Sequence, residues 1–120
     1  MTTTVLIVDD DADIRDMMRM FLETDGYRVI AAADGQDALQ QLQRARPGVV
    51  VLDLTMPDMD GEEFLERMRA TRFARTPVVI MSGRDSSRDK AAELHAAGCV
   101  NKPVDLDELL KTIRRIVSSS

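Results

Sequence analysis

Short apolar runs alternate with helix-like segments along the whole chain, and this alternation restricts the fold more than any other feature. Each run is rich in aliphatic, mostly β-branched residues and is bounded by turn signals. That pattern is typical of strands buried on both faces of a parallel sheet. We predict strands at Val5–Val8, Arg28–Ala32, Val49–Leu52 and Val78–Met81, with a weaker fifth strand at Cys99–Asn101.

The segments that follow these runs have the periodicity of amphipathic helices. Gly26 ends the first helix and Pro47 follows the second. The fourth segment, around Ala91–Leu94, is polar and has the weakest apolar face. Asp105 and Glu108 stand at capping-box spacing before the last helix. The apolar faces of the other four consist of Ile14, Met17, Met18, Phe21 and Leu22; Ala38, Leu39 and Leu42; Phe64, Leu65 and Met68; and Leu109, Leu110, Ile113, Ile116 and Val117.

The order of these elements is βαβαβαβαβα, which predicts an α/β protein with one doubly wound sheet. Strands that alternate with helices form a parallel sheet with right-handed crossovers, and the helices cover both of its faces. A chain of 120 residues has the length of a single domain. We expect that domain to span residues 3–117, with a short tail at 118–120.

The charge and the lack of long apolar runs argue against two classes of function. A net charge of −5 leaves no positive footprint for a nucleic-acid backbone. No apolar run approaches the roughly 20 residues of a membrane helix, and the opening MTTTVLIV is too short for a signal peptide. The single cysteine, Cys99, suits a reducing compartment. We therefore expect a cytoplasmic domain that binds neither nucleic acid nor membrane.

Polar residues follow four of the five predicted strands. Asp9 and Asp10 come after the first, Asp53 ends the third, Ser82 follows the fourth and Lys102 the fifth. These positions share the carboxyl edge of the sheet, where open α/β sheets bind ligands. Acids on neighbouring strands raise each other's pKa, and a hard divalent cation such as Mg²⁺ relieves that repulsion. A hydroxyl and an ammonium opposite could bind phosphoryl oxygens, so we expect Asp53 to meet both a metal and a phosphoryl group.

Four motifs in this order resemble a response-regulator receiver domain of two-component signalling, similar to chemotaxis regulators. They are VLIVDDD, VVLDLTMPDMDG, PVVIMSG and NKPVDLDEL, and the resemblance covers about residues 3–117. One motif alone would be weak, but four in order, each at the carboxyl end of a strand, are highly specific. The resemblance implies a flavodoxin-like (βα)5 fold with strand order 2-1-3-4-5.

The resemblance also implies a role for each acidic residue. Asp53 would be the phosphoacceptor, taking a phosphoryl group from a sensor histidine kinase or a histidine phosphotransfer protein. Together with Asp53, the metal ligands for Mg²⁺ would be Asp10 directly, Asp9 at least partly through water, and the backbone carbonyl of Thr55. The output would be a changed affinity for a downstream protein target. We expect no conventional enzyme activity, only self-catalysed phosphoryl transfer and autodephosphorylation.

Two further features of the pocket follow from the same resemblance. Ser82 and Lys102 would contact the phosphoryl oxygens, since phosphoryl transfer depends mostly on alignment and charge neutralisation. The peptide bond between Lys102 and Pro103 is expected to be cis, which would aim the ammonium into the pocket. Pro57 and Gly61 would shape the loop into the third helix, because Pro57 lacks an N–H and Gly61 tolerates a positive φ.

Asp11 is expected to be the N-cap of the first helix. Two other interpretations of the acids after the first strand fit less well. A calcium loop would need Gly in place of Ile14 and Glu in place of Met20. A phosphatase with Asp9 as nucleophile and Asp11 as acid would need cap segments for which this chain has no room.

The main alternative is a receiver-like interaction module that signals by protein contact without phosphorylation. Its mark would be an incomplete pocket. All five pocket positions are filled here, by Asp9, Asp10, Asp53, Ser82 and Lys102. The sequence therefore favours the phosphorylated receiver.

The fifth strand departs from the family pattern. If Gly98 matches the family glycine, the connection to Lys102 is shortened. If residues are instead counted back from Lys102, Cys99 takes the place of the aromatic switch residue and His95 that of the glycine. Either way the usual Tyr or Phe is missing. We expect the phosphorylation signal to travel through the loop at 83–89 and the fourth helix instead.

Overall fold

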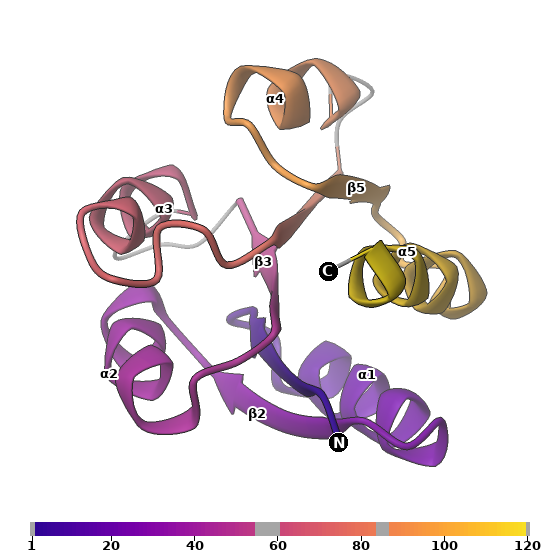
Figure 1. Ribbon diagram of the computed structural model, residues 1–120. Helices are drawn as coiled ribbons and strands as arrows, with labels where there is room; N and C mark the ends of the chain where they lie inside the picture. Colours follow the sequence, from indigo (N-terminus) through magenta and orange to yellow (C-terminus); the bar gives the residue numbers. More distant parts are fainter. Residues whose placement is uncertain (1, 55–60, 84–86, 120) are drawn as a thin grey trace.

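A computed structural model describes residues 2–54, 61–83 and 87–119 of the chain. Five strands and five helices alternate in this part (Figure 1). The strands are parallel and lie in the order β2-β1-β3-β4-β5. The predicted fold class and strand order are confirmed. The elements are β1 Thr4–Val8, α1 Ala12–Thr24, β2 Arg28–Ala32, α2 Gly35–Ala45, β3 Val49–Asp53, α3 Gly61–Arg69, β4 Val78–Ser82, α4 Ser87–Glu93, β5 Gly98–Asn101 and α5 Leu106–Ser119.

The sheet separates two apolar clusters. In β1, Leu6 and Val8 face the cluster under α2, α3 and α4, while Val5 and Ile7 face the cluster under α1 and α5. Figure 1 shows the same division, with α1 and α5 on one side of the sheet and α2 and α3 on the other. Because consecutive strand residues point to opposite faces, a strand buried on both faces needs an unbroken apolar run. All residues of β3 and β4 are accordingly buried.

The ends of the helices follow the predicted signals. Asp11 is the N-cap of α1, where its Oδ1 accepts the backbone N–H of Asp13 at 2.9 Å and of Ile14 at 3.2 Å. Asp105 caps α5 by accepting the backbone N–H groups of the two residues that follow Leu106. After α1 the chain turns at Gly26, whose φ is +94°. Local chemistry therefore sets where these helices begin and end.

The end of α4 distinguishes the two possible alignments of the fifth strand. His95 has a φ of +54°, a left-handed conformation that glycine adopts most easily. The backbone N–H of Ala96 donates to the carbonyl of Ala91 at 2.8 Å, which closes the helix. This geometry supports the count back from Lys102, in which His95 replaces the family glycine and Cys99 the aromatic residue. The side chain of His95 is exposed, just past the end of α4.

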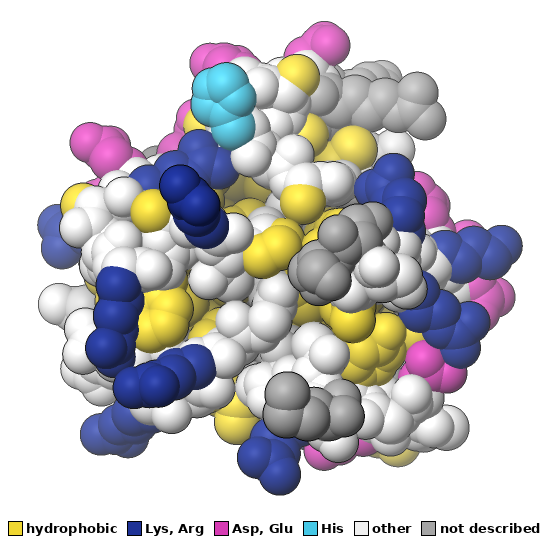
Figure 2. Space-filling model, in the orientation of Figure 1, with side chains coloured by type: hydrophobic (Ala, Val, Ile, Leu, Met, Phe, Trp, Pro, Cys, Tyr) yellow, Lys and Arg dark blue, Asp and Glu magenta, His cyan; other side chains and the backbone are white. Residues whose placement is uncertain are grey.

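Within the described ranges, none of the helices is both long enough and apolar enough to cross a membrane. The strands begin on the face that Figure 2 presents and run from it towards the candidate site. α5 ends on that same face.

Candidate functional site

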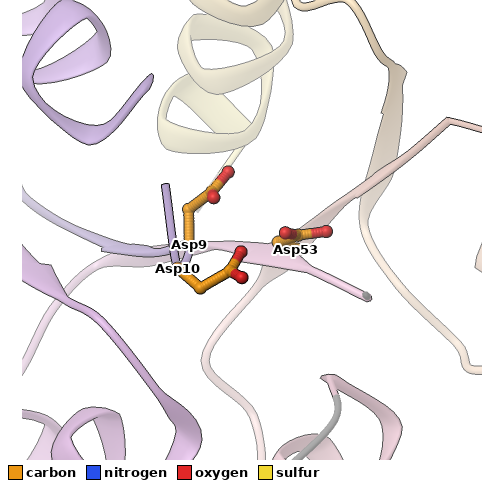
Figure 3. A group of neighbouring side chains, drawn as sticks. All are labelled: Asp9, Asp10 and Asp53. Carbon is orange, nitrogen blue, oxygen red and sulfur yellow. The ribbon is translucent and has the colours of Figure 1, made fainter. Parts of the chain in front are cut away.

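Three carboxylates meet where β1 and β3 end. Asp9 follows β1 directly, and Asp53 is the last residue of β3, whose Leu52 pairs with Val8. Asp9, Asp10 and Asp53 each offer one carboxylate oxygen, and these oxygens lie within 4.8 Å of one another. Figure 3 shows the three side chains projecting from these neighbouring strand ends. Asp9 and Asp53 are 0% and 1% exposed, whereas Asp10 is exposed. The cluster is thus buried on one side and open on the other.

Lys102 reaches this cluster from the turn after β5. Its Nζ donates a hydrogen bond to Asp53 Oδ2 at 3.0 Å and lies 3.4 Å from Asp9 Oδ2. Its backbone N–H donates to the carbonyl of Ser82 at 2.9 Å, which ties the turn to the end of β4. The bond between Lys102 and Pro103 is cis, as predicted. The structure therefore brings the side chains of the acids and of Lys102 together, with Ser82 buried at the end of the adjacent strand.

The buried acid Asp9 keeps one oxygen free of hydrogen bonds. Its Oδ1 accepts the backbone N–H of Asp11 at 2.9 Å. Its Oδ2 accepts no hydrogen bond from the described residues, although the ammonium of Lys102 is near. The ion pair with Lys102 offsets part of the cost of burying this oxygen, and a bound metal cation would offset more of it. With two more carboxylates beside it, the donor set suits a hard divalent cation, and the cluster could bind a metal.

Burial and charge act on the two kinds of ionisable group in opposite ways. Burial raises the pKa of the Asp9 carboxyl above its usual value, and the hydrogen bond from Asp11 and the charge of Lys102 only partly offset this. Burial alone would lower the pKa of Lys102. The hydrogen bond and charge of Asp53, with the charge of Asp9, outweigh that effect and raise the Lys102 pKa. The single ammonium of Lys102 therefore does not fully offset the cost of ionising the buried Asp9 carboxyl.

Replacing Asp9 with Asn is expected to stabilise the metal-free protein at neutral pH. Because the pKa of Asp9 is raised in the fold, the folded state holds its proton more tightly than the unfolded state does. Asp9 therefore costs stability as pH rises above its ordinary pKa. Urea unfolding in EDTA should show Asp9→Asn more stable than the wild type at about pH 8, with a much smaller difference at about pH 4. The exposed Asp16→Asn is the control, and an equal effect of Asp9→Asn at both pH values would contradict the prediction.

Some predicted positions fall outside the described residues. These are Thr55 and Pro57, together with part of the loop at 83–89. Gly61 is described, and it begins α3 directly beneath the backbone of Asp53 and Leu54. Its φ does not lie in the left-handed region, so the reason given for it above is wrong. Close approach of two backbones is what requires glycine there.

Sequence reasoning missed Arg15 as part of this site. Its guanidinium donates a hydrogen bond to the backbone carbonyl of Asp9 at 2.7 Å. That contact holds the loop between β1 and α1 that carries Asp9 and Asp10. A detectable signal existed, because Arg15 lies one helical turn after the N-cap Asp11 and its side chain can reach back over that turn.

Comparison with known proteins agrees with this geometry. The family model of the response regulator receiver domain matches residues 5–114. The response regulator MprA of Mycobacterium leprae is 38% identical over 115 residues, which is 94% of this chain and 50% of that protein. The probable transcriptional regulatory protein TcrX of Mycobacterium tuberculosis is 35% identical over 116 residues, 95% of this chain and 49% of that protein.

Solved structures of similar size show the same fold. The chemotaxis response regulator CheY4 of Vibrio cholerae superposes with a TM-score of 0.89 at 36% identity, over 97% of this chain and 99% of that one. A CheY-like receiver domain from Methanospirillum hungatei superposes with a TM-score of 0.89 at 28% identity, over 99% and 96% of the two chains. The chain spans about half the length of the curated relatives above. It belongs to the family of response regulator receiver domains of two-component systems.

Proposed function

We propose that this receiver accepts a phosphoryl group on Asp53 and signals through a phosphorylation-dependent change in protein binding. One observation carries the proposal: the Asp53 carboxylate, buried at the end of β3, meets the Lys102 ammonium at 3.0 Å beside the carboxylates of Asp9 and Asp10. Receivers of response regulators interact with histidine kinases, so the donor would be a sensor histidine kinase or a histidine phosphotransfer protein.

The transfer needs one nucleophile and little other covalent chemistry. A carboxylate oxygen of Asp53 forms a bond to phosphorus while the bond from phosphorus to the donor's histidine nitrogen breaks. The electron pair of the broken bond leaves on that nitrogen. Lys102 is held beside Asp53 by its backbone bond to Ser82, so its ammonium can follow the negative charge onto the phosphoryl oxygens. Ser82, at the end of β4, would offer its hydroxyl to another of these oxygens.

The acidic cluster would hold Mg²⁺. Asp9, Asp10 and Asp53 supply carboxylate ligands, and the Thr55 carbonyl is the further ligand expected from the sequence. When bound, the ion supplies positive charge that offsets the carboxylates and the transferred phosphoryl group. The buried Oδ2 of Asp9 supports this assignment, because the described residues give it the ion pair with Lys102 but no hydrogen bond.

We also propose residues 3–117 as the extent of the receiver and the cytoplasm as its location. Support for the extent comes from β1, which begins at Thr4, and from Val117, which packs against the core late in α5. The downstream target is proposed to be a protein. The signal is proposed to leave through α4 and the loop before it, because Cys99 cannot fill the space of an aromatic ring.

Incubation of the wild-type protein with acetyl phosphate and Mg²⁺ should add the mass of one phosphoryl group. Acetyl phosphate is a small donor that needs no kinase, so the reaction depends on the receiver's own pocket. Intact-mass spectrometry measures the uptake, and EDTA should abolish it because the carboxylates would then repel the incoming group. If no label appears with or without Mg²⁺, the phosphorylation-independent interaction module becomes the better account.

A further inference from the structure

A hollow with a mixed apolar and basic lining lies at the opposite edge of the sheet from the acidic site. It has a volume of about 530 Å³. Its walls are the end of α3, the turn that leads into β4, and the turn between α4 and β5. The lining includes Arg69, Arg75, Thr76 and His95 and contains no acidic residue. β4 begins at this hollow with Val78 and ends at the candidate phosphorylation site with Ser82. The two sites therefore lie at opposite ends of the same strand.

The two guanidinium groups of this hollow have no carboxylate partner within the described ranges. Arg69 donates one hydrogen bond, from a terminal nitrogen to the carbonyl of His95 at 3.0 Å. That bond fixes the guanidinium at the end of α4 while its other N–H groups stay available, since an arginine carries five. Neither Arg69 nor Arg75 takes part in an ion pair with a described acid. By contrast, the neighbouring Arg67 is paired with Glu63 at 3.1 Å.

The charge of this face contrasts with that of the whole chain. The protein carries a net charge of −5. Figure 2 nevertheless shows Lys and Arg side chains over α2 and α3 on this face, and a further group over α5 that is mixed with Asp and Glu. Anions approaching the molecule in general meet repulsion, so a site that holds an anion needs local cations, and Arg69 and Arg75 supply them at the hollow.

We propose that this hollow binds a small molecule through its phosphate groups. Arginine forms paired hydrogen bonds with phosphate oxygens, and two arginines match the double charge of a phosphate or diphosphate. The hydroxyl of Thr76 and the imidazole of His95 add donors on the same wall. The volume falls within the range of small-molecule sites, and the hollow is open to solvent, so that a small charged group can enter it.

Inorganic pyrophosphate in EDTA is the probe, because the chelator prevents a metal from drawing it into the acidic site. Amide NMR should show saturable shifts at residues 74–76, 78 and 95–97, with a dissociation constant of about 1 mM or lower. Arg75→Gln should weaken binding at least about tenfold, the effect of losing a charge-assisted hydrogen bond. Arg75 is exposed, so this variant should fold normally. Arg69→Gln should weaken binding by a similar factor.

Arg72→Gln is the matched control. Arg72 lies in the same turn and carries the same charge, but it stacks over Phe73 and does not line the hollow. Its loss should change affinity by less than about twofold, since distant exposed charges are screened. The proposal is wrong if Arg72→Gln weakens binding as much as Arg75→Gln, or if the shifts do not saturate. It is also wrong if a glutamate-rich peptide binds more tightly than pyrophosphate. Binding of ADP that is as tight as that of pyrophosphate, or tighter, would support the proposal. The difference in affinity would measure the contribution of the nucleoside.

Discussion

Asp53→Asn is expected to abolish phosphoryl uptake from acetyl phosphate while leaving the fold intact. The amide keeps the shape of the carboxylate and an oxygen that can accept the hydrogen bond of Lys102. It lacks the anionic oxygen that must attack phosphorus. The loss in rate should exceed about a thousandfold, which is complete in a labelling experiment read by intact mass. Because this variant removes the nucleophile and little else, it is the sharpest test of the proposed chemistry.

The control for this experiment is Asp13→Asn. Asp13 is an exposed acid in the first turn of α1, close in sequence to the pocket but outside the carboxylate cluster. It should be labelled like the wild type, and circular dichroism should show the same helix content in all three proteins. Equal labelling of Asp53→Asn and the wild type would exclude Asp53 as the acceptor. Loss of labelling in Asp13→Asn as well would point to a general charge effect.

Gly61→Ala is expected to destabilise the protein by about 3 kcal/mol, at the upper end for overpacking in a core. A Cβ at this position would lie 2.6 Å from the carbonyl oxygen of Asp53 and 2.7 Å from the Cα of Leu54. Both are backbone atoms of a buried segment, so neither can move aside as the end of a flexible side chain could. Relief requires a shift of α3 or of the strand end that carries Asp53. Urea unfolding measures the cost.

Gly83→Ala is the matched control for this substitution. Among the described residues, a Cβ there would meet the Cβ of Lys102 alone, at an ordinary contact distance of 3.9 Å. Its effect on the free energy of unfolding should stay within about 0.5 kcal/mol. If the two variants cost the same, close approach at Gly61 is not what the structure indicates. A displaced Asp53 should also slow phosphoryl uptake by Gly61→Ala in the fraction that remains folded.

The elements that could be predicted are those with a strong local signal. β3 and β4 are apolar throughout their first four residues, and α1 has both a capping acid and a terminal glycine. α4 was the weakest prediction because its residues are polar, so periodicity did not mark its limits. The structure begins it at Ser87 and ends it at Glu93. The strand order came from the family resemblance, since an alternation of strands and helices is compatible with several orders.

The contacts within the site depend on distances along the chain that no local pattern carries. Lys102 and Asp53 are 49 residues apart, and their hydrogen bond follows from the strand order and the turn after β5. The sequence could place both residues at one edge of the sheet. The sequence could not predict that Lys102 would donate a hydrogen bond to Asp53 and lie farther from Asp9. Arg69 and His95 are likewise 26 residues apart, and only the packed fold brings them together.

The division of the apolar residues by the sheet has a consequence for how such a domain can diverge. Leu6 and Ile7 are neighbours in the sequence, yet they belong to two apolar clusters that have no described side chain in common. Substitutions can therefore change the helices on one side of the sheet, and with them one set of protein contacts. The side chains on the other side can keep their packing. The sheet thus separates two apolar interiors whose packing can change independently, and the candidate phosphorylation site lies at its carboxyl edge.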